Sequence, residues 1–396
     1  MEHPLFMLVL FRTFVRKFIP MIDFTKIPSP CFVLDEGLLR RNLETIADVQ
    51  RRSGAEIIVA LKACAMWSVF PLMSRYAAGA TASSVAEARL VSDEFGSPAH
   101  TYAPVYTDAE FGQIMQYSDH ITFNSVAQFE RFGPQAILRG ISCGLRINPG
   151  YSPVETDLYN PCVSGSRLGI PVEALPVLPR GVEGLHFHTL CECGPEELAR
   201  TLDAVEDRFG HFLPRIKWLN MGGGHLMTRE DYDRDRLVEI LLRFRERHPN
   251  LRLILEPGSA FTWRMGWLVS TVEDVVCNGG VHTAMLNVSF ACHMPDCLEM
   301  PYKPAIVGAH APAPGEKRWR MGGNSCLAGD FCGDWAFGKD PEPGDRIVFE
   351  DMIHYTMVKT TMFNGVTHPS IGIVGEDGAF RLVRRFGYED YRDRMS

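Results

Sequence analysis

Eight short apolar segments recur along the first two-thirds of the chain, and stretches of helical character separate them. The eight segments are Ile57–Leu61, Gly79–Ala82, Ala99–Ala103, His120–Phe123, Ser142–Ile147, Gly184–His188, Trp218–Met221 and Leu253–Leu255. Between them, segments such as Ser84–Glu94, Glu196–Phe209 and Arg234–Arg247 repeat apolar residues at helical intervals. Because parallel strands need long crossovers, this alternation predicts a parallel sheet. Eight such units in about 200 residues predict an α/β fold, a closed (β/α)₈ TIM barrel.

The pattern changes after residue 265. The segments WLVSTVEDVV, TAMLNVSF, RWRMGG and DRIVFEDM are typical of strands, and Gly and Pro turns rather than long helices separate them. We therefore expect a barrel domain over residues 21–265 and a mostly antiparallel β-domain over 266–396, with a C-terminal return to the barrel. The strand-like run Pro30–Asp35 precedes the barrel units, and we expect it to join the β-domain. The chain, 396 residues with 46% hydrophobic content, is large enough for two cores.

Residues with chemically active side chains or flexible backbone stand at the ends of the predicted barrel strands. They are Lys62, Arg146, Asn148, His188, Gly222, Gly223, Gly224 and Glu256. Barrel enzymes build their active sites at the carboxyl ends of the strands, so we expect these residues to converge in space.

Four of these strand ends suggest a specific chemistry, each beside an alternative. Lys62 follows five apolar residues, where desolvation lowers the pKa of a lysine and frees its amine for a Schiff base; alternatively, it reaches water. The run Gly222–Gly224 offers backbone donors for a phosphate, or forms only a tight turn. Glu256 needs a cationic partner, which a protonated pyridine nitrogen or a nearby arginine would provide. His186 and His188 would both face the barrel interior, to bind a metal or to stack on a ring.

Composition excludes several other classes of function. A net charge of −8 and a pI of about 5.9 argue against nucleic acid as a partner. The eleven cysteines contain no CxxC pair, so we expect no metal site and free thiols in a reducing cytoplasm. Residues 1–20 hold a short apolar run, Leu5–Phe11, with basic residues after it, which is the reverse of a signal peptide and too short to span a membrane. We interpret residues 1–20 as an extension before a start at Met21, or as an interfacial helix.

Six motifs occur in an order that resembles a known family. VALKA, GLHFH, MGGGH, LEPG, GGNSCLAGD and FEDMIHYTMVKTTMFNG are similar to segments of the alanine-racemase-like (fold type III) pyridoxal-phosphate decarboxylases, over residues 21–396. IPSPCFVLDE, GLHFHTLCE and CHMPDCLEMPYKP resemble the branch that acts on carboxynorspermidine and carboxyspermidine. The resemblance implies pyridoxal 5'-phosphate as cofactor, a carboxylated polyamine as substrate and a role in polyamine biosynthesis. Ornithine or diaminopimelate decarboxylation, racemisation and non-catalytic cofactor binding are the alternatives.

The resemblance also implies roles for individual residues. Lys62 would form the Schiff base, His188 would stack on the cofactor ring, and Arg146 would lie beneath it. Gly222, Gly223 and Gly224 would bind the phosphate together with the Tyr355 hydroxyl, and Glu256 would pair with the pyridinium nitrogen. The implied proton donor is Cys326, which would enter the neighbouring subunit's site in a homodimer. The candidate substrate-binding residues are Asp296, Glu299 and Asp330.

One position departs from the family pattern. Many relatives carry an arginine directly after EPG, where this chain has Ser259. A serine adds no charge, so another group would have to neutralise the phosphate. Arg264 and a helix N-terminus are the two candidates.

Overall fold

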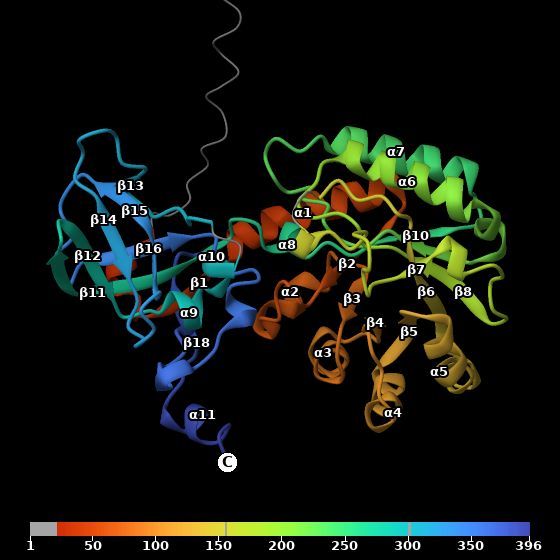
Figure 1. Ribbon diagram of the computed structural model, residues 1–396, viewed down its shortest axis with the longest axis horizontal. Coiled ribbons are helices and arrows are strands. Elements are labelled where there is room, and N and C mark those ends of the chain that lie inside the picture. The colour runs from red at the N-terminus through yellow and green to blue at the C-terminus, as the bar shows by residue number, and fades with distance from the viewer. Residues whose placement is uncertain (1–21, 155–156, 300–301) are drawn as a thin grey trace, which may run out of the picture.

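The computed structural model describes residues 22–154, 157–299 and 302–396. Its two parts lie side by side in Figure 1, a barrel with its ring of helices and a second domain built on a separate sheet. The interpretation of residues 1–20 concerns a segment outside the described residues. Within the described ranges, no helix combines the length and the apolar character needed to cross a bilayer.

The predicted (β/α)₈ barrel is confirmed, because its eight parallel strands close on themselves through the pairing of β5 with β6. In barrel order the strands are β5 (Ser118–Phe123), β4 (Ala99–Tyr102), β3 (Gly79–Ala82), β2 (Glu56–Ala60), β10 (Arg252–Leu255), β9 (Trp218–Asn220), β8 (Val182–His186) and β6 (Ser142–Asn148). A two-residue strand, β7 (Ile170–Pro171), adds to the end of β6. Each predicted segment therefore forms a strand, with ends that differ by a few residues.

Helices cover the outside of the barrel (Figure 1). They are α1 (Glu36–Ser53), α2 (Phe70–Met73), α3 (Val85–Leu90), α4 (Asp108–Tyr117), α5 (Val126–Leu138), α6 (Pro195–Phe209), α7 (Arg234–Arg247) and α8 (Ser259–Thr262). Capping residues set both ends of α1. At its N-terminus the Asp35 side chain accepts a hydrogen bond from the Leu38 amide, and at its C-terminus Gly54 adopts the left-handed conformation that ends the helix. Its apolar face, which includes Leu39, Leu43 and Ile46, is fully buried.

The second domain is mostly antiparallel, as predicted. Its strands are β1 (Cys31–Asp35), β11 (Gly266–Asn278), β12 (Val281–Leu286), β13 (Ala309–His310), β14 (Trp319–Gly322), β15 (Phe331–Phe337), β16 (Arg346–Glu350), β17 (Ser370–Val374) and β18 (Phe380–Arg384). The early strand β1 lies in this sheet, antiparallel to β11 and parallel to β17. Three short α-helices accompany the sheet in the described part of this domain: α9 (Phe290–His293), α10 (Pro295–Glu299) and α11 (Tyr388–Arg392).

The two domains share one continuous cluster of buried apolar side chains, to which Leu39 and Leu255 of the barrel and Leu268 and Phe349 of the second domain belong. At the C-terminal end, Glu376 in the β17–β18 turn forms an ion pair with Arg40 of α1. This continuity lets the second domain hold residues next to the mouth of the barrel.

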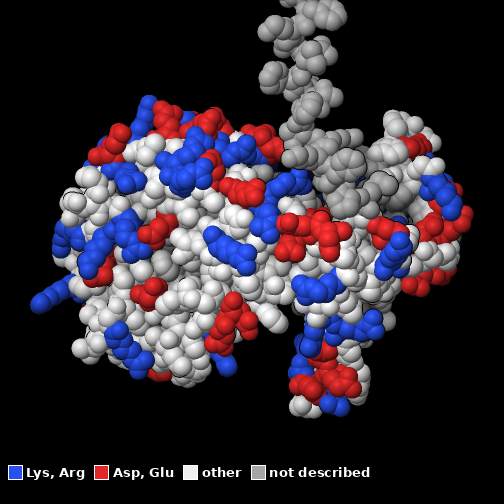
Figure 2. Space-filling model, turned by 180° about the vertical axis from the view of Figure 1, so that it is seen from behind, with Lys and Arg blue, Asp and Glu red and all other residues white. Residues whose placement is uncertain are grey.

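Basic and acidic side chains are interspersed on the face shown in Figure 2. The protruding C-terminal segment follows the same pattern, with Arg384 paired to Asp390 and Arg392 paired to Asp393. Exposed pairs of this kind contribute little to stability. On this face, charge of either sign is therefore distributed rather than gathered into a single field.

A large aromatic side chain fills the end of the barrel where the strands begin. Trp218 on β9 is almost fully buried, and its indole nitrogen donates a hydrogen bond to the Ser142 hydroxyl at 2.9 Å. Two glycines make room for its ring, because a Cβ on Gly144 of β6 or Gly184 of β8 would overlap it. Glycine at these two positions is thus a packing requirement.

We predict that Gly184→Ala lowers the free energy of unfolding by about 1–3 kcal/mol, because the added methyl group overpacks the Trp218 ring. Gly112→Ala is the matched control. Gly112 lies inside α4, and no neighbouring atom lies within 4 Å of the point that a Cβ would occupy, so this change should stabilise the protein by about 0.5–1 kcal/mol. Urea unfolding measures both, and equal effects of the two substitutions would contradict the packing argument.

Candidate active site

A cavity of about 650 Å³ opens at the carboxyl ends of the barrel strands. The described residues that line it all belong to the barrel, and they include Lys62, Arg146, His186, His188 and Glu256. These five residues follow or end four different strands, β2, β6, β8 and β10. The closed barrel therefore brings together side chains that lie far apart in the sequence.

Lys62 follows β2 and points into this cavity. Its Nζ lies 3.2 Å from Nε2 of His188. The side chain is accessible to the solvent in the cavity, but protein atoms surround it closely enough that desolvation lowers the pKa of the amine, although Glu256 opposes the shift. A larger fraction of Lys62 is therefore present as the neutral amine than for a lysine in water.

His188 is held by the glycine run on the neighbouring strand end. The Gly223 amide donates a hydrogen bond to Nδ1 of His188 at 2.9 Å. Nδ1 is thus an acceptor, which leaves Nε2 to face Lys62. Burial, together with the charges of Lys62 and Arg146, holds the pKa of His188 well below its usual value. The imidazole is therefore neutral, and its contacts with the Gly223 amide at Nδ1 and with Lys62 at Nε2 fix its orientation.

Arg146 approaches the same histidine from β6. Its Nη2 donates a hydrogen bond to the backbone carbonyl of His188 at 3.2 Å. The guanidinium also lies 4.7 Å from the centre of the Tyr102 ring, a cation–π contact. Arg146 is nearly inaccessible to solvent, so its charge acts in the cavity with little screening.

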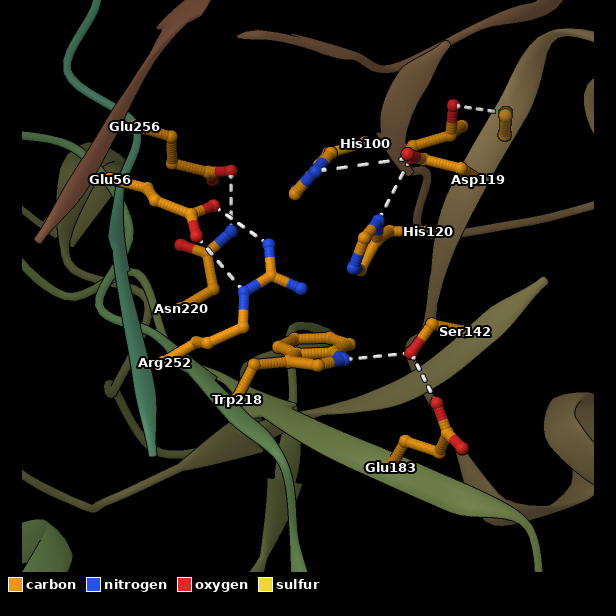
Figure 3. Close-up of polar contacts among 12 residues, drawn as sticks. Glu56, His100, Asp119, His120, Ser142, Glu183, Trp218, Asn220, Arg252 and Glu256 are labelled. Carbon is orange, nitrogen blue, oxygen red and sulfur yellow. Dashed lines mark hydrogen bonds and ion pairs between the residues drawn. The ribbon is translucent and has the colours of Figure 1, made fainter. Parts of the chain in front are cut away.

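Glu256 is buried at the end of β10, and two barrel side chains occupy its carboxylate. Nε2 of His186 lies 3.1 Å from Oε1, and Nδ2 of Asn220 donates to Oε2 at 3.0 Å, the contact drawn in Figure 3. Burial alone would raise the pKa of Glu256, but the contact with Nε2 of His186 and the nearby charge of Lys62 outweigh it and hold the pKa below its usual value. The carboxylate is therefore an anion at neutral pH.

The three consecutive glycines bring the main chain close to its neighbours. Gly222 and Gly224 have φ values of 70° and 89°, in the region that favours glycine. A Cβ on Gly223 would lie 2.6 Å from the carbonyl oxygen of Glu256, and one on Gly222 or Gly224 would strike the backbone of the segment that follows β8. Only glycine fits this cradle, in which the Gly222 amide donates to Oδ1 of Asn220 and the Gly223 amide to Nδ1 of His188, each at 2.9 Å.

Tyr355 comes from the second domain and lies beside the lysine segment. Its backbone amide donates to the carbonyl of Ala63, the neighbour of Lys62, at 2.8 Å, and its φ of 45° is strained for a tyrosine. Burial raises the pKa of its hydroxyl, which therefore stays protonated.

Asp296 and Glu299, on α10 of the second domain, both pair with the same lysine. Nζ of Lys359 forms an ion pair with the Asp296 carboxylate and lies 2.9 Å from Oε2 of Glu299. Although partial burial opposes it, this pairing raises the pKa of Lys359. Two carboxylates facing one ammonium leave a formal charge of −1 on the group.

Two further predicted residues lie apart from the cavity of their own chain. Cys326 is exposed, and its amide donates to the Asn364 side chain at 2.9 Å. Asp330 is buried, and its two carboxylate oxygens accept the amides of Ala291 and Ser325 at 3.0 Å. These two hydrogen bonds tie Asp330 to α9 and to the loop that carries Cys326.

Because Ser259 carries no charge, Arg264 and a helix N-terminus are the two candidates for neutralising the phosphate, and the structure shows where each lies. Its guanidinium lies over the Trp263 ring, 5.5 Å from the centre, and the residue is exposed. Ser259 begins α8, a single turn of four residues. The Arg264 charge is thus directed toward Trp263 rather than into the cavity.

Sequence reasoning missed three features of the site. It proposed a pyridine or an arginine as the partner of Glu256 but did not identify His186 and Asn220. It also did not identify Lys359 as the partner of Asp296 and Glu299. The segment after β6 contributes further lining residues, including Asp157 and Arg167, which no motif marked. Asn220 directly precedes the predicted phosphate loop in the motif WLNMGGG, a position that could have drawn notice.

Comparisons with known proteins match this architecture. The family model described as "Pyridoxal-dependent decarboxylase, C-terminal sheet domain" matches residues 31–353. A carboxyaminopropylagmatine decarboxylase of Synechocystis is 52% identical over 94% of this chain and 96% of its own. A carboxynorspermidine/carboxyspermidine decarboxylase of Campylobacter jejuni is 37% identical over 93% of this chain and 98% of its own.

A solved structure extends the likeness to three dimensions. The crystal structure of carboxynorspermidine decarboxylase from Campylobacter jejuni, complexed with norspermidine, superposes with a TM-score of 0.86 at 35% identity and covers 93% of this chain and 100% of the other. The family resemblance found in the motifs is thereby confirmed over both domains. The chain belongs to the pyridoxal-phosphate-dependent decarboxylases of the alanine-racemase-like fold.

Proposed function

We propose that this chain decarboxylates a carboxylated polyamine, with carboxyaminopropylagmatine as the first candidate and carboxynorspermidine and carboxyspermidine as the next. The observation that carries the proposal is the 52% identity to a carboxyaminopropylagmatine decarboxylase along nearly the whole of both chains. The relatives named for the two carboxylated triamines are 37% identical. All three compounds join an α-amino acid at one end to a cationic group at the other, so one type of site accommodates them.

The residues in the cavity fit pyridoxal phosphate. The run Gly222–Gly224 places main chain without side chains beside His188 and Glu256, where a phosphate would approach the backbone closely. Lys62 offers an amine with a lowered pKa for the aldehyde, and Glu256 offers a buried anion for the ring nitrogen. When bound, the cofactor supplies a sink for the electron pair that departing CO₂ leaves behind.

The protein residues would then orient the reaction and move its protons. Glu256, oriented by His186 and Asn220, would hold a proton on the pyridine nitrogen. The flat imidazole of His188 would support the ring, and Arg146 would sit beneath it. After CO₂ has left, the thiol of Cys326 would deliver a proton to the α-carbon.

The distal cation of the substrate would bind at α10. Asp296 and Glu299 carry one more negative charge than Lys359 neutralises, and this excess suits an ammonium or a guanidinium. Burying such a cation without a partner is costly, so the acidic group would select long cationic substrates over short neutral ones.

We further propose that the active enzyme is a homodimer with shared sites. Cys326 is exposed and lies apart from the cavity of its own chain, while the cavity lining in the described residues comes from the barrel alone. A second copy that presents its Cys326 loop to the cavity would complete the site. Closed two-fold dimers would form two such sites.

The cofactor assignment predicts a covalent label at one residue. The purified protein should absorb visible light, and borohydride should attach the pyridoxyl group to Lys62, identified by mass spectrometry of the peptide. Lys62→Ala should lose the label and the activity, whereas Lys217→Ala, which removes an exposed lysine paired with Glu183, should keep both. A label on another lysine would refute the assignment.

The substrate assignment predicts an ordered preference. Carboxyaminopropylagmatine should have a kcat/KM at least about tenfold above those of carboxynorspermidine and carboxyspermidine, and ornithine and diaminopimelate should react far more slowly. Asp296→Asn should lower kcat/KM for the long substrates by about tenfold or more, and Glu299→Gln, whose side chain is 54% exposed, by less.

The control for this acidic group is Glu342→Gln, which removes an exposed carboxylate paired with Lys339 and should leave kcat/KM unchanged. The cofactor absorbance should not change in any of these variants. Wild-type kcat/KM in both Asp296→Asn and Glu299→Gln would mean that the distal cation binds elsewhere. Equal rates with ornithine and the long substrates would remove the proposed specificity.

The shared-site model predicts complementation between inactive chains. Lys62→Ala and Cys326→Ala chains, each inactive alone, should recover about a quarter of wild-type activity after random exchange, since half of the dimers are mixed and each has one intact site. A chain carrying both substitutions provides the control, because mixing it with either single variant should restore nothing. No recovery after proven subunit exchange would argue against sharing.

A further inference from the structure

Two histidines and an aspartate meet at the end of the barrel opposite the cavity. His100 stands near the beginning of β4, and Asp119 and His120 stand near the beginning of β5. Figure 3 shows both imidazoles directed toward the Asp119 carboxylate. One ligand atom from each of the three side chains lies within 4.8 Å of the others.

An irregularity in strand pairing creates this arrangement. Ala99 pairs with Ser118, but the next residue, His100, pairs with His120, so Asp119 is an extra residue in β5. In a regular strand Asp119 would point to the face opposite His120. The bulge turns its carboxylate toward the two imidazoles, and bulges commonly redirect a side chain in this way at functional sites.

The spacing of the three groups is close to that of a coordination sphere. Oδ1 of Asp119 lies 2.8 Å from Nδ1 of His120 and 3.9 Å from Nε2 of His100. A tetrahedral zinc ion, with bonds of about 2.0–2.1 Å, separates its ligand atoms by about 3.3 Å. Side-chain shifts of about an ångström would therefore bring all three atoms onto one ion.

The surroundings hold two of the ligands and leave one open. The side chains of His100 and His120 are only 15% and 11% exposed, and their rings stack with centres 4.0 Å apart. The Trp218 ring packs edge-on against His120, 5.6 Å away. The Asp119 side chain is 49% exposed, which gives an ion a route from solvent.

The neighbouring charges of the same barrel end are already paired. Arg252 makes two hydrogen bonds to Glu56, at 3.0 and 2.8 Å, and Lys217 pairs with Glu183. The cations beside the cluster are thus neutralised by carboxylates of their own, and Asp119 keeps its charge for the two histidines.

We propose that His100, Asp119 and His120 bind a divalent transition-metal ion, zinc foremost, which ties β4 to β5 at the amino-terminal end of the barrel. Two imidazoles and one carboxylate are the ligand types that zinc takes, and water would complete the sphere. The site is separate from the decarboxylation chemistry at the other end of the barrel. No motif reveals it, because the two histidines are on different strands.

Zinc titration of the metal-free holoenzyme tests the proposal. Isothermal calorimetry after chelator dialysis should find one zinc ion per chain that His100→Ala and His120→Gln no longer bind, and Asp119→Asn should weaken its affinity by tenfold or more. His310→Ala, which removes an exposed histidine paired with Glu316, should bind zinc like the wild type. Cys191→Ser should also bind zinc normally, which separates this site from the free thiols of Cys191 and Cys193.

A second measurement does not depend on calorimetry. Zinc at a hundredfold excess over its Kd should raise the unfolding temperature of the wild type by about 2–5 °C and leave the cluster variants unchanged. Circular dichroism and cofactor absorbance show whether each variant is folded. If the histidine variants do not fold, Asp119→Asn, a change at a half-exposed position, provides the test by itself. Zinc binding that survives in all three cluster variants, or that is lost in Cys191→Ser instead, overturns the proposal.

Discussion

The buried carboxylate of Glu256 is the constraint around which the active end of the barrel is built. An ion in a barrel core is costly unless hydrogen bonds and opposite charges surround it. Here His186 and Asn220, from β8 and β9, occupy its two oxygens. Strand register places them, because Asn220 pairs with His186 on one side and with Ile254 of β10 on the other. A slip of one residue would leave the charge without partners and turn the glycine cradle away from His188.

Under the proposed function, the two domains divide the work of catalysis. The barrel carries the residues that fit the cofactor, and its closed sheet holds them rigidly at the strand ends, as a preorganised site requires. The second domain carries Asp296, Glu299 and Lys359 on short helices and turns, where, under the proposed function, substitutions would alter specificity without disturbing the barrel. This separation agrees with a family in which one fold serves decarboxylases of different substrates.

At the opposite end of the barrel, where the strands begin, buried side chains are also packed closely and polar groups are also paired. Trp218 fills the interior there, and glycines at 144 and 184 give it room. The polar groups nearby form hydrogen bonds with one another: Arg252 donates to Glu56, and the Trp218 indole donates to Ser142 (Figure 3). The bulge at Asp119 adds the cluster of two histidines and a carboxylate, to which we assign a metal ion.

The sequence alone determined the barrel and the residues that end its strands, because apolar periodicity is local and the carboxyl ends of parallel strands must meet. Lys62, His188 and Glu256 could be selected on that ground, and the motifs around them identified the family. Only the tertiary structure decided the partners: His186 and Asn220 for Glu256, and Lys359 for Asp296 and Glu299. The contacts of Asp330 with backbone amides, and the turn of Asp119 toward two histidines, were likewise beyond prediction. Such pairings depend on strand register, a bulge and the docking of two domains, and these arise from contacts between residues tens to hundreds of positions apart.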